Sequence, residues 1–455
     1  MFFARSYIPY YKRNLKVAIP VVISQVGQVT VMLADNIMVG WLGPMELAAV
    51  SFAGSIYVIG MVFGLGFSVG LTPLVGLAYG EDNFRKVSSF FQNSLFLNVL
   101  STIFFMTLMF VVSNFLGHMG QEQIVVDLAY PYYNILVWSF LPQMVFFSGK
   151  HFAEGIGNTK VAMYITLGCN LLNVVLNYLL IYGKFGFPEM GVRGAAIATL
   201  ISRVCMALWI IGILWSRITF RRYFMFFRKE KLSLKRIQQL VNISVPISLQ
   251  IGIETLTFSL CGIMVGWVGG ISLAANQVAQ TMTSLTFMMA LGIASATTIR
   301  VSHQLGAKNY EGARKAGFAS MHLVLAFMSV AAFCFIMFRN QLPLIFNDEP
   351  ELVAIASQLF IIAGIFQLFD GLQVVSMAAL RGMADTKIPM IISFVSYVVV
   401  CLSVGYVLAF VAHLGAAGVW IGYIAGLSVA AIWLTLRFNR KSRALCRGGA
   451  KHLSF

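Results

Sequence analysis

The feature that most constrains the fold of this chain is a segment that occurs twice. The pentad IMVGW stands at residues 37–41 and again at residues 263–267, an offset of 226 residues in a chain of 455. The same register aligns residues 20–80 with residues 246–306 without a gap, proline on proline and glycine on glycine at the two ends. One register held through apolar and polar stretches alike indicates a tandem repeat with the same fold in each half.

The low content of charged residues indicates the environment in which each half folds. Only 11% of the residues are charged and 59% are hydrophobic, whereas a soluble domain carries roughly 25% charged residues. We therefore predict a polytopic membrane protein. A bilayer core requires about 20 apolar residues per helix. The predicted spans, six in each half, lie near residues 17–40, 48–74, 90–113, 130–149, 161–182, 194–214, 241–266, 273–298, 317–338, 353–379, 388–411 and 417–437.

Lysine and arginine residues between the spans predict the orientation, because segments rich in them stay in the cytoplasm. With the N-terminus in the cytoplasm, the cytoplasmic segments hold 28 of the 32 Lys and Arg residues. The outside loops then hold only Lys184, Arg193 and Arg339. We predict that both termini are cytoplasmic. The net charge of +16 follows from this topology, so no nucleic-acid partner is expected.

The predicted fold is all-α, with twelve transmembrane helices in two six-helix lobes. An even number of spans in each half makes the second half enter the membrane in the same direction as the first, which is a parallel repeat. We place the lobes at residues 1–216 and 241–440, a basic connector at 217–240 and a basic cytoplasmic tail at 441–455. The connector is either an interfacial helix on anionic lipid or a plain positive-inside signal, and the second interpretation is favoured.

Ionisable side chains at membrane depth are costly, so they are candidates for function. Three acids qualify, namely Asp35, Glu254 and Asp370. In the repeat register Glu254 falls on Gln28, and at an offset of 227 Asp370 falls on Gln143. Asp35 falls on Cys261 in the first register, so each acid stands opposite a neutral residue. Such asymmetry suits a carboxylate that exchanges a proton or a metal cation for a cationic substrate, and structural hydrogen bonding is the alternative.

Neutral polar side chains accompany these acids. Asn173 and Asn177 lie four residues apart, so their amides share one face of a helix. Together with Asp35 and Thr199 they would form an oxygen-rich cluster for a hard cation or a proton-linked network. Ordinary hydrogen bonding between helices is an equally open interpretation. The predicted supporting network consists of Asn173, Asn177, Thr199, Gln28 and Gln277.

Two basic groups at membrane depth leave alternatives open. Arg203 either pairs with Asp35 or extends along its helix to the cytoplasmic surface, and the second interpretation is favoured. His322 is interpreted as a packed, hydrogen-bonded residue rather than a proton carrier.

Motifs of catalysis and of ATP binding are absent from the sequence. It contains no G-x-x-x-x-G-K-[ST] loop, no H-E-x-x-H, no G-x-S-x-G and no Cys/His cluster. We therefore expect neither an enzyme nor a bound cofactor. Transport, if it occurs, is expected to be driven by an ion gradient.

Several motifs together resemble the multidrug and toxic compound extrusion (MATE) family over nearly the whole chain. They are ADNIMVG at 34–40, NVVLNY at 173–178, MGVRGAAIAT at 190–199, IRVSHQLGA at 299–307, FDGLQ at 369–373 and LRGMADTK at 380–387. The resemblance implies two six-helix lobes around a central cavity that opens alternately to each side. It implies export of cationic or amphipathic drugs in exchange for Na⁺ or H⁺.

The resemblance also implies roles for the acids. The family's coupling acid on helix 1 matches Asp35, and the cation site of its NorM-like branch matches Glu254 and Asp370, which would then bind Na⁺. Some members carry a second Asp on helix 5, where this chain has Asn177. The first lobe thus departs from a complete Na⁺ site but keeps a proton network through Asp35.

The leading hypothesis is an ion-coupled antiporter, a monomer in contact with lipid in the bacterial inner membrane. The alternative is a flippase for lipid or lipid-linked saccharide within the same superfamily. A flippase would require more basic groups at membrane depth, where the sequence places Arg203 against three acids.

Overall fold

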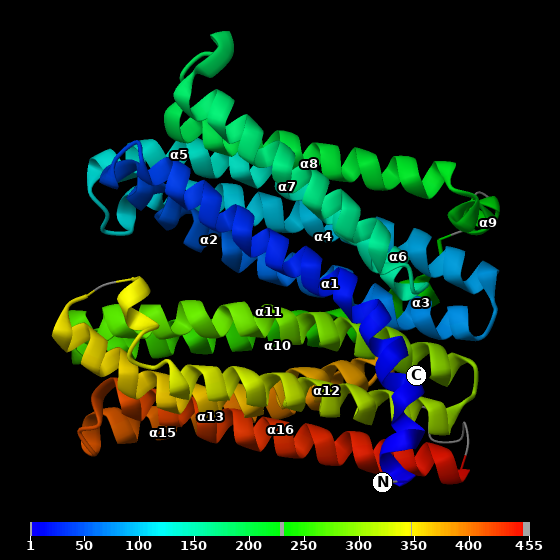
Figure 1. The fold of residues 1–455 in the computed structure, drawn as a ribbon. Helices are drawn as coiled ribbons and strands as arrows, with labels where there is room; N and C mark the ends of the chain where they lie inside the picture. Colours follow the sequence, from blue (N-terminus) through cyan, green and yellow to red (C-terminus); the bar gives the residue numbers. More distant parts are fainter. Residues whose placement is uncertain (1, 228–231, 347, 449–455) are drawn as a thin grey trace. The chain divides into compact units, whose positions relative to one another are not determined.

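The computed structural model of the chain describes residues 2–227, 232–346 and 348–448, and these residues are almost entirely helical (Figure 1). The first half contains α1 (Phe2–Gly40), α2 (Pro44–Val69), α3 (Leu71–Gly80), α4 (Phe84–Ser113), α5 (Gln123–Trp138), α6 (Phe140–Gly155), α7 (Thr159–Tyr182), α8 (Gly191–Ser216) and α9 (Ile218–Phe227). The second half contains α10 (Leu234–Val268), α11 (Gly270–Gly306), α12 (Tyr310–Met337), α13 (Pro350–Gly382), α14 (Lys387–Phe394), α15 (Leu402–Tyr406) and α16 (Gly415–Gly448). Two π-helical segments, Val395–Cys401 and Val407–Val411, flank α15.

The prediction of twelve spans is confirmed for the described residues, which contain 12 helices long and apolar enough to cross a membrane. Three of these spans join consecutive elements: α2 with α3, α5 with α6, and the stretch from α14 to the second π-helical segment. Most spans extend several residues beyond their predicted ends. Lys150 and Arg381, which the sequence analysis placed in loops, lie on α6 and α13. The predicted spans ended too early here because each apolar run was taken to end at the first charged residue.

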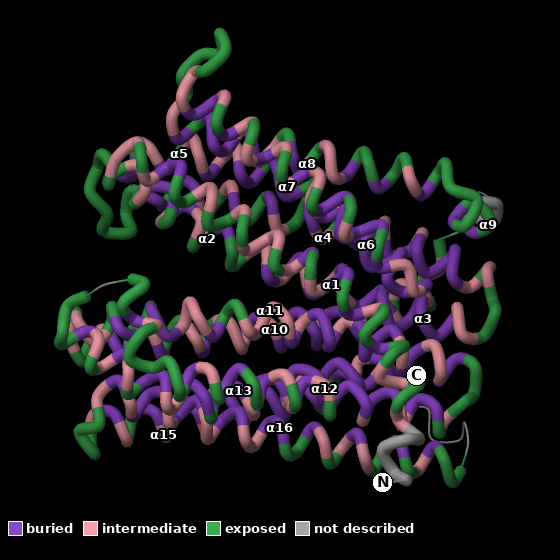
Figure 2. The backbone as a smooth tube through the Cα atoms, viewed as in Figure 1, coloured by how far each residue is buried: buried purple, intermediate pink, exposed green. Residues whose placement is uncertain are grey.

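Large apolar side chains cover the outer surfaces of the spans. Phe104 is 66% exposed, Leu171 68% and Leu208 63%. Figure 2 shows exposed positions recurring along the long helices, interleaved with buried ones. Water would make such surfaces unfavourable, whereas lipid tails are as apolar as leucine. This burial pattern is that of helices packed within a bilayer.

The chain forms two compact units, Met1–Val22 with Leu249–Phe455, and Ile23–Ser248. We call them the C unit and the N unit. Their boundaries fall inside α1 and α10, in the first helix of each half, rather than at the 217–240 connector by which the sequence analysis divided the lobes. The two boundaries lie at equivalent repeat positions, two residues after Pro20 and Pro246.

The N unit holds the beginning of α10 through small residues. The hydroxyls of Ser244 and Ser248 donate to the backbone carbonyls of Phe67 and Phe63 on α2, both at 3.0 Å. Gly66 permits this contact, because a Cβ there would lie 2.4 Å from the Ser248 Cα. Glycine at such a position lets two helix backbones approach closely.

The C unit holds the beginning of α1 by the equivalent contact. Gly292 on α11 is the repeat counterpart of Gly66, and a Cβ there would lie 2.9 Å from the backbone nitrogen of Val22, the counterpart of Ser248. Asn14 adds hydrogen bonds from its amide nitrogen to the Ala316 carbonyl at 3.0 Å and the Ser320 hydroxyl at 2.8 Å, both on α12. Each unit therefore packs the beginning of a helix whose remainder belongs to the other unit.

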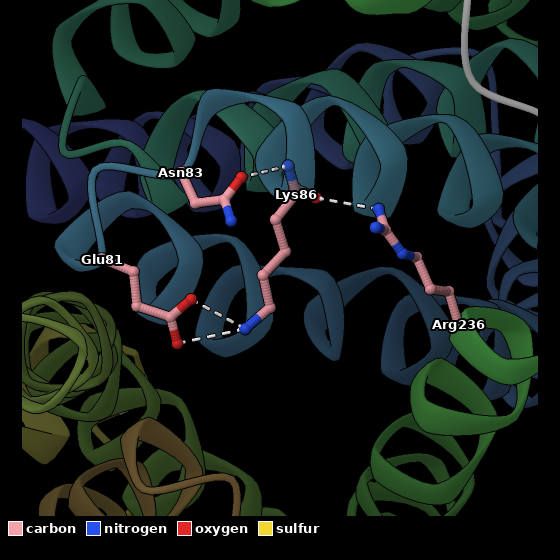
Figure 3. A network of polar contacts seen from close by, with 4 residues as sticks. All are labelled: Glu81, Asn83, Lys86 and Arg236. Atoms are coloured by element: carbon pink, nitrogen blue, oxygen red, sulfur yellow. Dashed lines mark hydrogen bonds and ion pairs between the residues drawn. The ribbon is translucent and has the colours of Figure 1, made fainter.

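Polar contacts fix the start of α10 to the N unit as well (Figure 3). The Arg236 guanidinium donates to the Lys86 carbonyl at 3.5 Å, and the Lys86 ammonium pairs with Glu81 at 2.8 Å. Asn83 caps α4 by accepting from the Lys86 backbone nitrogen at 2.9 Å. The Arg236 contact joins the end of the connector to α4, and the other two hold the first turn of α4 in place.

The connector contains the short helix α9, which packs on protein. Its Phe220 and Tyr223 are buried, at 0% and 1% exposed, against Phe152. Part of the apolar surface that an interfacial helix would insert into lipid is therefore occupied by the N unit. The basic residues Arg228, Lys229 and Lys231 lie outside the described residues.

We predict that Gly66→Ala and Gly292→Ala each lower thermal stability. The added methyl would overlap Ser248 or Val22, and overpacking of this kind costs about 1–3 kcal/mol. The measurement is the unfolding midpoint of the purified protein in detergent. Gly212→Ala is the matched control, because a Cβ there meets nothing within 4 Å. Equal midpoints for all three variants would contradict the close helix contacts.

Candidate functional site

The C unit brings two predicted acids together. Glu254 on α10 and Asp370 on α13 are close enough to interact electrostatically, and both interact with the hydroxyl of Tyr397. Asp370 and Tyr397 are 3% and 1% exposed, while Glu254 is half-buried. Tyr397 lies on the first π-helical segment. Such segments occur frequently at functional sites because the extra residue redirects side chains.

Arg381 on α13 supplies the positive charge of this cluster. Its guanidinium interacts with Glu254 and donates to the Gln250 side-chain oxygen on α10 at 2.8 Å. With both carboxyls ionised, two negative charges face one positive charge, which leaves a net charge of −1. One added proton or monovalent cation would neutralise it. Charge is expensive at membrane depth, so this imbalance favours binding of a cation.

Buried polar atoms around Asp370 lack protein partners. Among the described residues, nothing hydrogen-bonds to Asp370 Oδ1 or to either amide atom of Gln367 and Gln373. These glutamines flank Asp370 at three residues on either side of α13, so they lie near it on the helix. An unsatisfied buried polar group costs about 1–3 kcal/mol. The arrangement provides oxygens suited to a hard cation or to water.

No group of three His, Cys, Asp and Glu side chains that could hold a metal occurs in the part of the chain that the structure describes. A metal cation at Glu254 and Asp370 would therefore take its remaining ligands from neutral oxygens. Gln367, Gln373 and Tyr397 are the residues that offer them.

The N unit brings three other predicted residues together. The Asn177 amide on α7 donates to the Asp35 carboxylate on α1 at 2.5 Å and to the Asn173 side-chain oxygen at 3.3 Å. Asn173 and Asn177 are buried, at 4% and 0% exposed, and Asp35 is half-buried. The Tyr182 hydroxyl donates to the Met38 carbonyl at 2.6 Å. This bond fixes α7 beside the part of α1 that carries Asp35.

Arg203 on α8 corrects the sequence interpretation. Its guanidinium does not extend to the surface but donates to the hydroxyls of Tyr57 at 2.7 Å and Ser139 at 2.6 Å. It also lies 5.1 Å from the Tyr57 ring centroid, a cation–π contact. The Tyr57 hydroxyl in turn donates to Gln143 at 2.7 Å. Arg203 interacts electrostatically with Asp35, so this cluster contains one acid and one base.

The remaining candidates do not join these clusters through any contact recorded among the described residues. The Thr199 hydroxyl donates to the Ala195 carbonyl of its own helix at 3.0 Å. Gln277 is exposed on α11, and Gln28 is half-buried on α1. His322 Nδ1 and the Tyr11 hydroxyl share a hydrogen bond of 3.1 Å. His322 is thus a packed, hydrogen-bonded residue.

Sequence reasoning missed one further buried group. Glu154 on α6 is 3% exposed and lies 3.3 Å from His151 Nδ1 and 3.9 Å from Lys150 Nζ. Glu154 is also the repeat counterpart of Arg381 at an offset of 227. A glycine follows each of them, Gly155 after Glu154 and Gly382 after Arg381. This shared glycine could have identified Glu154 and Arg381 as repeat counterparts from the sequence. Lys150 and Arg381, which the sequence analysis left outside the spans, also lie on helices long and apolar enough to cross a membrane.

Comparison with known proteins supports the same architecture. A family model described as MatE matches residues 20–179 and 246–407, two stretches that begin one repeat apart. The probable multidrug resistance protein NorM of Rhizobium meliloti is 32% identical over 443 residues, covering 96% of this chain and 95% of that protein.

Two solved structures have the same fold. An outward-facing multidrug resistance MATE family transporter of the MOP superfamily has a TM-score of 0.88 and 23% identity, covering 96% of this chain and 97% of that one. A MOP superfamily transporter from Pyrococcus furiosus has a TM-score of 0.86, 23% identity and the same coverage. The reversed polarity of that protein's binding pocket was taken to suggest a different function.

We predict that Arg203→Gln destabilises the N unit. The change removes two hydrogen bonds from a charged donor, which contribute about 1.5–3 kcal/mol each, and leaves Asp35 without its basic neighbour. Thermal unfolding of the purified protein measures the effect. Arg193→Gln, an exposed change on the same helix, should leave the midpoint unchanged. Identical curves for the two variants would show that the Arg203 contacts do not stabilise the fold.

Proposed function

This chain belongs to the MatE family, and on that premise we propose that it exports cationic and amphipathic drugs in exchange for Na⁺ or H⁺. The observation that carries the proposal is that two carboxyl groups, Glu254 and Asp370, share one guanidinium, that of Arg381, in one cluster. The name of the Rhizobium meliloti relative supports the drug substrates. We place the protein in the bacterial inner membrane, as a monomer with both termini in the cytoplasm.

The proposed coupling rests on competition for one negative charge. Neutralising the cluster once removes most of its attraction for a second cation, so a bound Na⁺ or proton disfavours a drug cation, and the reverse also holds. Exchange requires that the two occupants favour different states of the transporter, because a ligand shifts an equilibrium only by its differential affinity. We propose that the two units alternate between inward-open and outward-open states, each favoured by one occupant.

We propose a separate role in cation binding for each residue of the cluster. Half-buried Glu254 meets the incoming cation, while nearly inaccessible Asp370 holds the charge away from water. Arg381 prevents a second cation from binding by keeping the net charge at −1. The Tyr397 hydroxyl can donate to an ionised carboxylate and accept from a protonated carboxyl, because a hydroxyl both donates and accepts.

Asp35 has a different proposed role. Its carboxylate has a basic neighbour in Arg203, so the Asp35 cluster, with one acid and one base, has no excess negative charge to attract a metal cation. A proton added to Asp35 would instead alter its hydrogen bond with Asn177. We propose that Asp35 is a proton-linked switch of the N unit, and that its supporting residues are Asn173 and Asn177.

A flippase for lipid or lipid-linked saccharide remains the second candidate. Arg203, Arg381 and Lys150 favour it, because they lie on spanning helices and could meet phosphate. Against it, Arg203 and Lys150 have neighbouring acids in Asp35 and Glu154. The Arg381 cluster is itself net negative. An anionic substrate would be repelled there, so the antiporter is the better supported proposal.

We predict that Asp370→Asn and Glu254→Gln abolish drug export without unfolding the protein. Each change removes the excess negative charge, so neither coupling ion nor drug cation is attracted. Ethidium efflux from cells or vesicles measures export, and membrane expression with size-exclusion chromatography checks folding. Glu311→Gln, which alters an exposed carboxylate paired with Lys315, is the control and should export normally. Wild-type efflux by both Asp370→Asn and Glu254→Gln would refute the assignment.

A further inference from the structure

A groove opens between α14 and the C-terminal half of α16, away from the clusters described above. Its volume is about 470 Å³. Four of its lining side chains are apolar, Ile388 and Ile392 from α14 with Trp433 and Leu436 from α16. Three of them are substantially exposed, at 40% for Ile388, 47% for Trp433 and 46% for Leu436. The groove thus offers open apolar surface at the side of a membrane span.

The remaining lining residues of the groove are basic. Arg437, Arg440 and Lys441 line it, on the same stripe of α16 as the apolar residues. At a rise of 1.5 Å per residue, Trp433 and Arg440 lie about 10 Å apart along the axis of α16. The change from apolar to cationic along one helix matches an amphiphile with an acyl chain and an anionic head.

Charge in the groove is unbalanced. Asp385 accepts hydrogen bonds from Arg437 at 2.8 Å and pairs with the Lys441 ammonium at 3.1 Å. Its single negative charge leaves one of these two cations uncompensated. Arg440 is exposed, and the described residues provide no recorded hydrogen bond or ion pair for it. The groove therefore has a net charge of about +2 from these four groups, which favours anions and repels cationic drugs.

We propose that this groove binds an anionic phospholipid, with its phosphate on Arg440 and the adjacent basic residues and an acyl chain against Trp433, Leu436 and Ile388. Pre-positioned Arg437 and Lys441 contribute, because Asp385 holds their side chains in place. A soluble phosphate would leave the apolar wall uncovered, and a zwitterionic lipid would leave the excess charge uncompensated. In the predicted orientation the groove faces the cytoplasmic leaflet, where anionic lipids attract basic residues.

Native mass spectrometry of the delipidated full chain tests the proposal, with palmitoyl-oleoyl-phosphatidylglycerol and the matching phosphatidylcholine added separately. We expect phosphatidylglycerol to be retained in preference to phosphatidylcholine. Arg440→Gln should reduce phosphatidylglycerol retention about fivefold, since one cation near an anionic lipid contributes about that factor. Arg440→Lys should restore most of it. Arg447→Gln, the same charge change on an exposed residue of α16 outside the groove, should behave as the wild type.

Three outcomes would overturn the proposal. Equal retention by Arg440→Gln and Arg447→Gln would show that the groove does not hold the lipid. Equal retention of phosphatidylcholine by the wild type would show that the charge is not recognised. Displacement of phosphatidylglycerol by a large excess of inorganic phosphate would indicate an anion site without a lipid tail. Leu436→Asn provides a separate check of the apolar wall, and undiminished phosphatidylglycerol retention there would also contradict the proposal.

Discussion

Two carboxyl groups and one guanidinium lie together inside the C unit, where little water screens them. Removing charges from water costs several kcal/mol per ion, and mutual attraction offsets this only when the charges balance. Glu254, Asp370 and Arg381 do not balance. We propose that one bound cation compensates the excess negative charge that the cluster has when both carboxyls are ionised, and that the unsatisfied amides of Gln367 and Gln373 add oxygens for it. The proposed exchange of drug for ion follows from this single imbalance.

The repeat explains why the imbalance is confined to one unit. Both halves build their first helix around the same proline and glycine contacts, at Pro20 and Pro246 and at Gly66 and Gly292. The side chains placed on that common backbone differ, because Asp370 replaces the neutral amide at Gln143. In the N unit that amide accepts a hydrogen bond from Tyr57, which also receives Arg203. Equivalent positions thus serve a neutral network in one unit and a charged one in the other.

Much of this organisation could be predicted from the sequence, for identifiable reasons. Twelve apolar runs predicted the spans, and the i, i+4 spacing of Asn173 and Asn177 predicted that their amides share one face of a helix. Arg381 was missed because a charged residue ends an apolar run even when neighbouring helices bury it. The partners of Arg203 were missed because Tyr57 and Ser139 are distant in sequence, and no periodicity relates them. The hydroxyl of Thr199 bonds to the preceding turn of its own helix, at Ala195, and no periodicity in the sequence indicates that bond.

Competition for one negative charge is measured most directly by counting the cations released when a drug binds. Ethidium would be titrated into the purified protein in weakly buffered solution, with a pH electrode recording protons, first without Na⁺ and then at increasing Na⁺ concentration. The account predicts release of about one proton per ethidium without Na⁺, or an ethidium affinity that falls as Na⁺ rises. Ethidium binding with no proton release, and with an affinity independent of both pH and Na⁺, would contradict it.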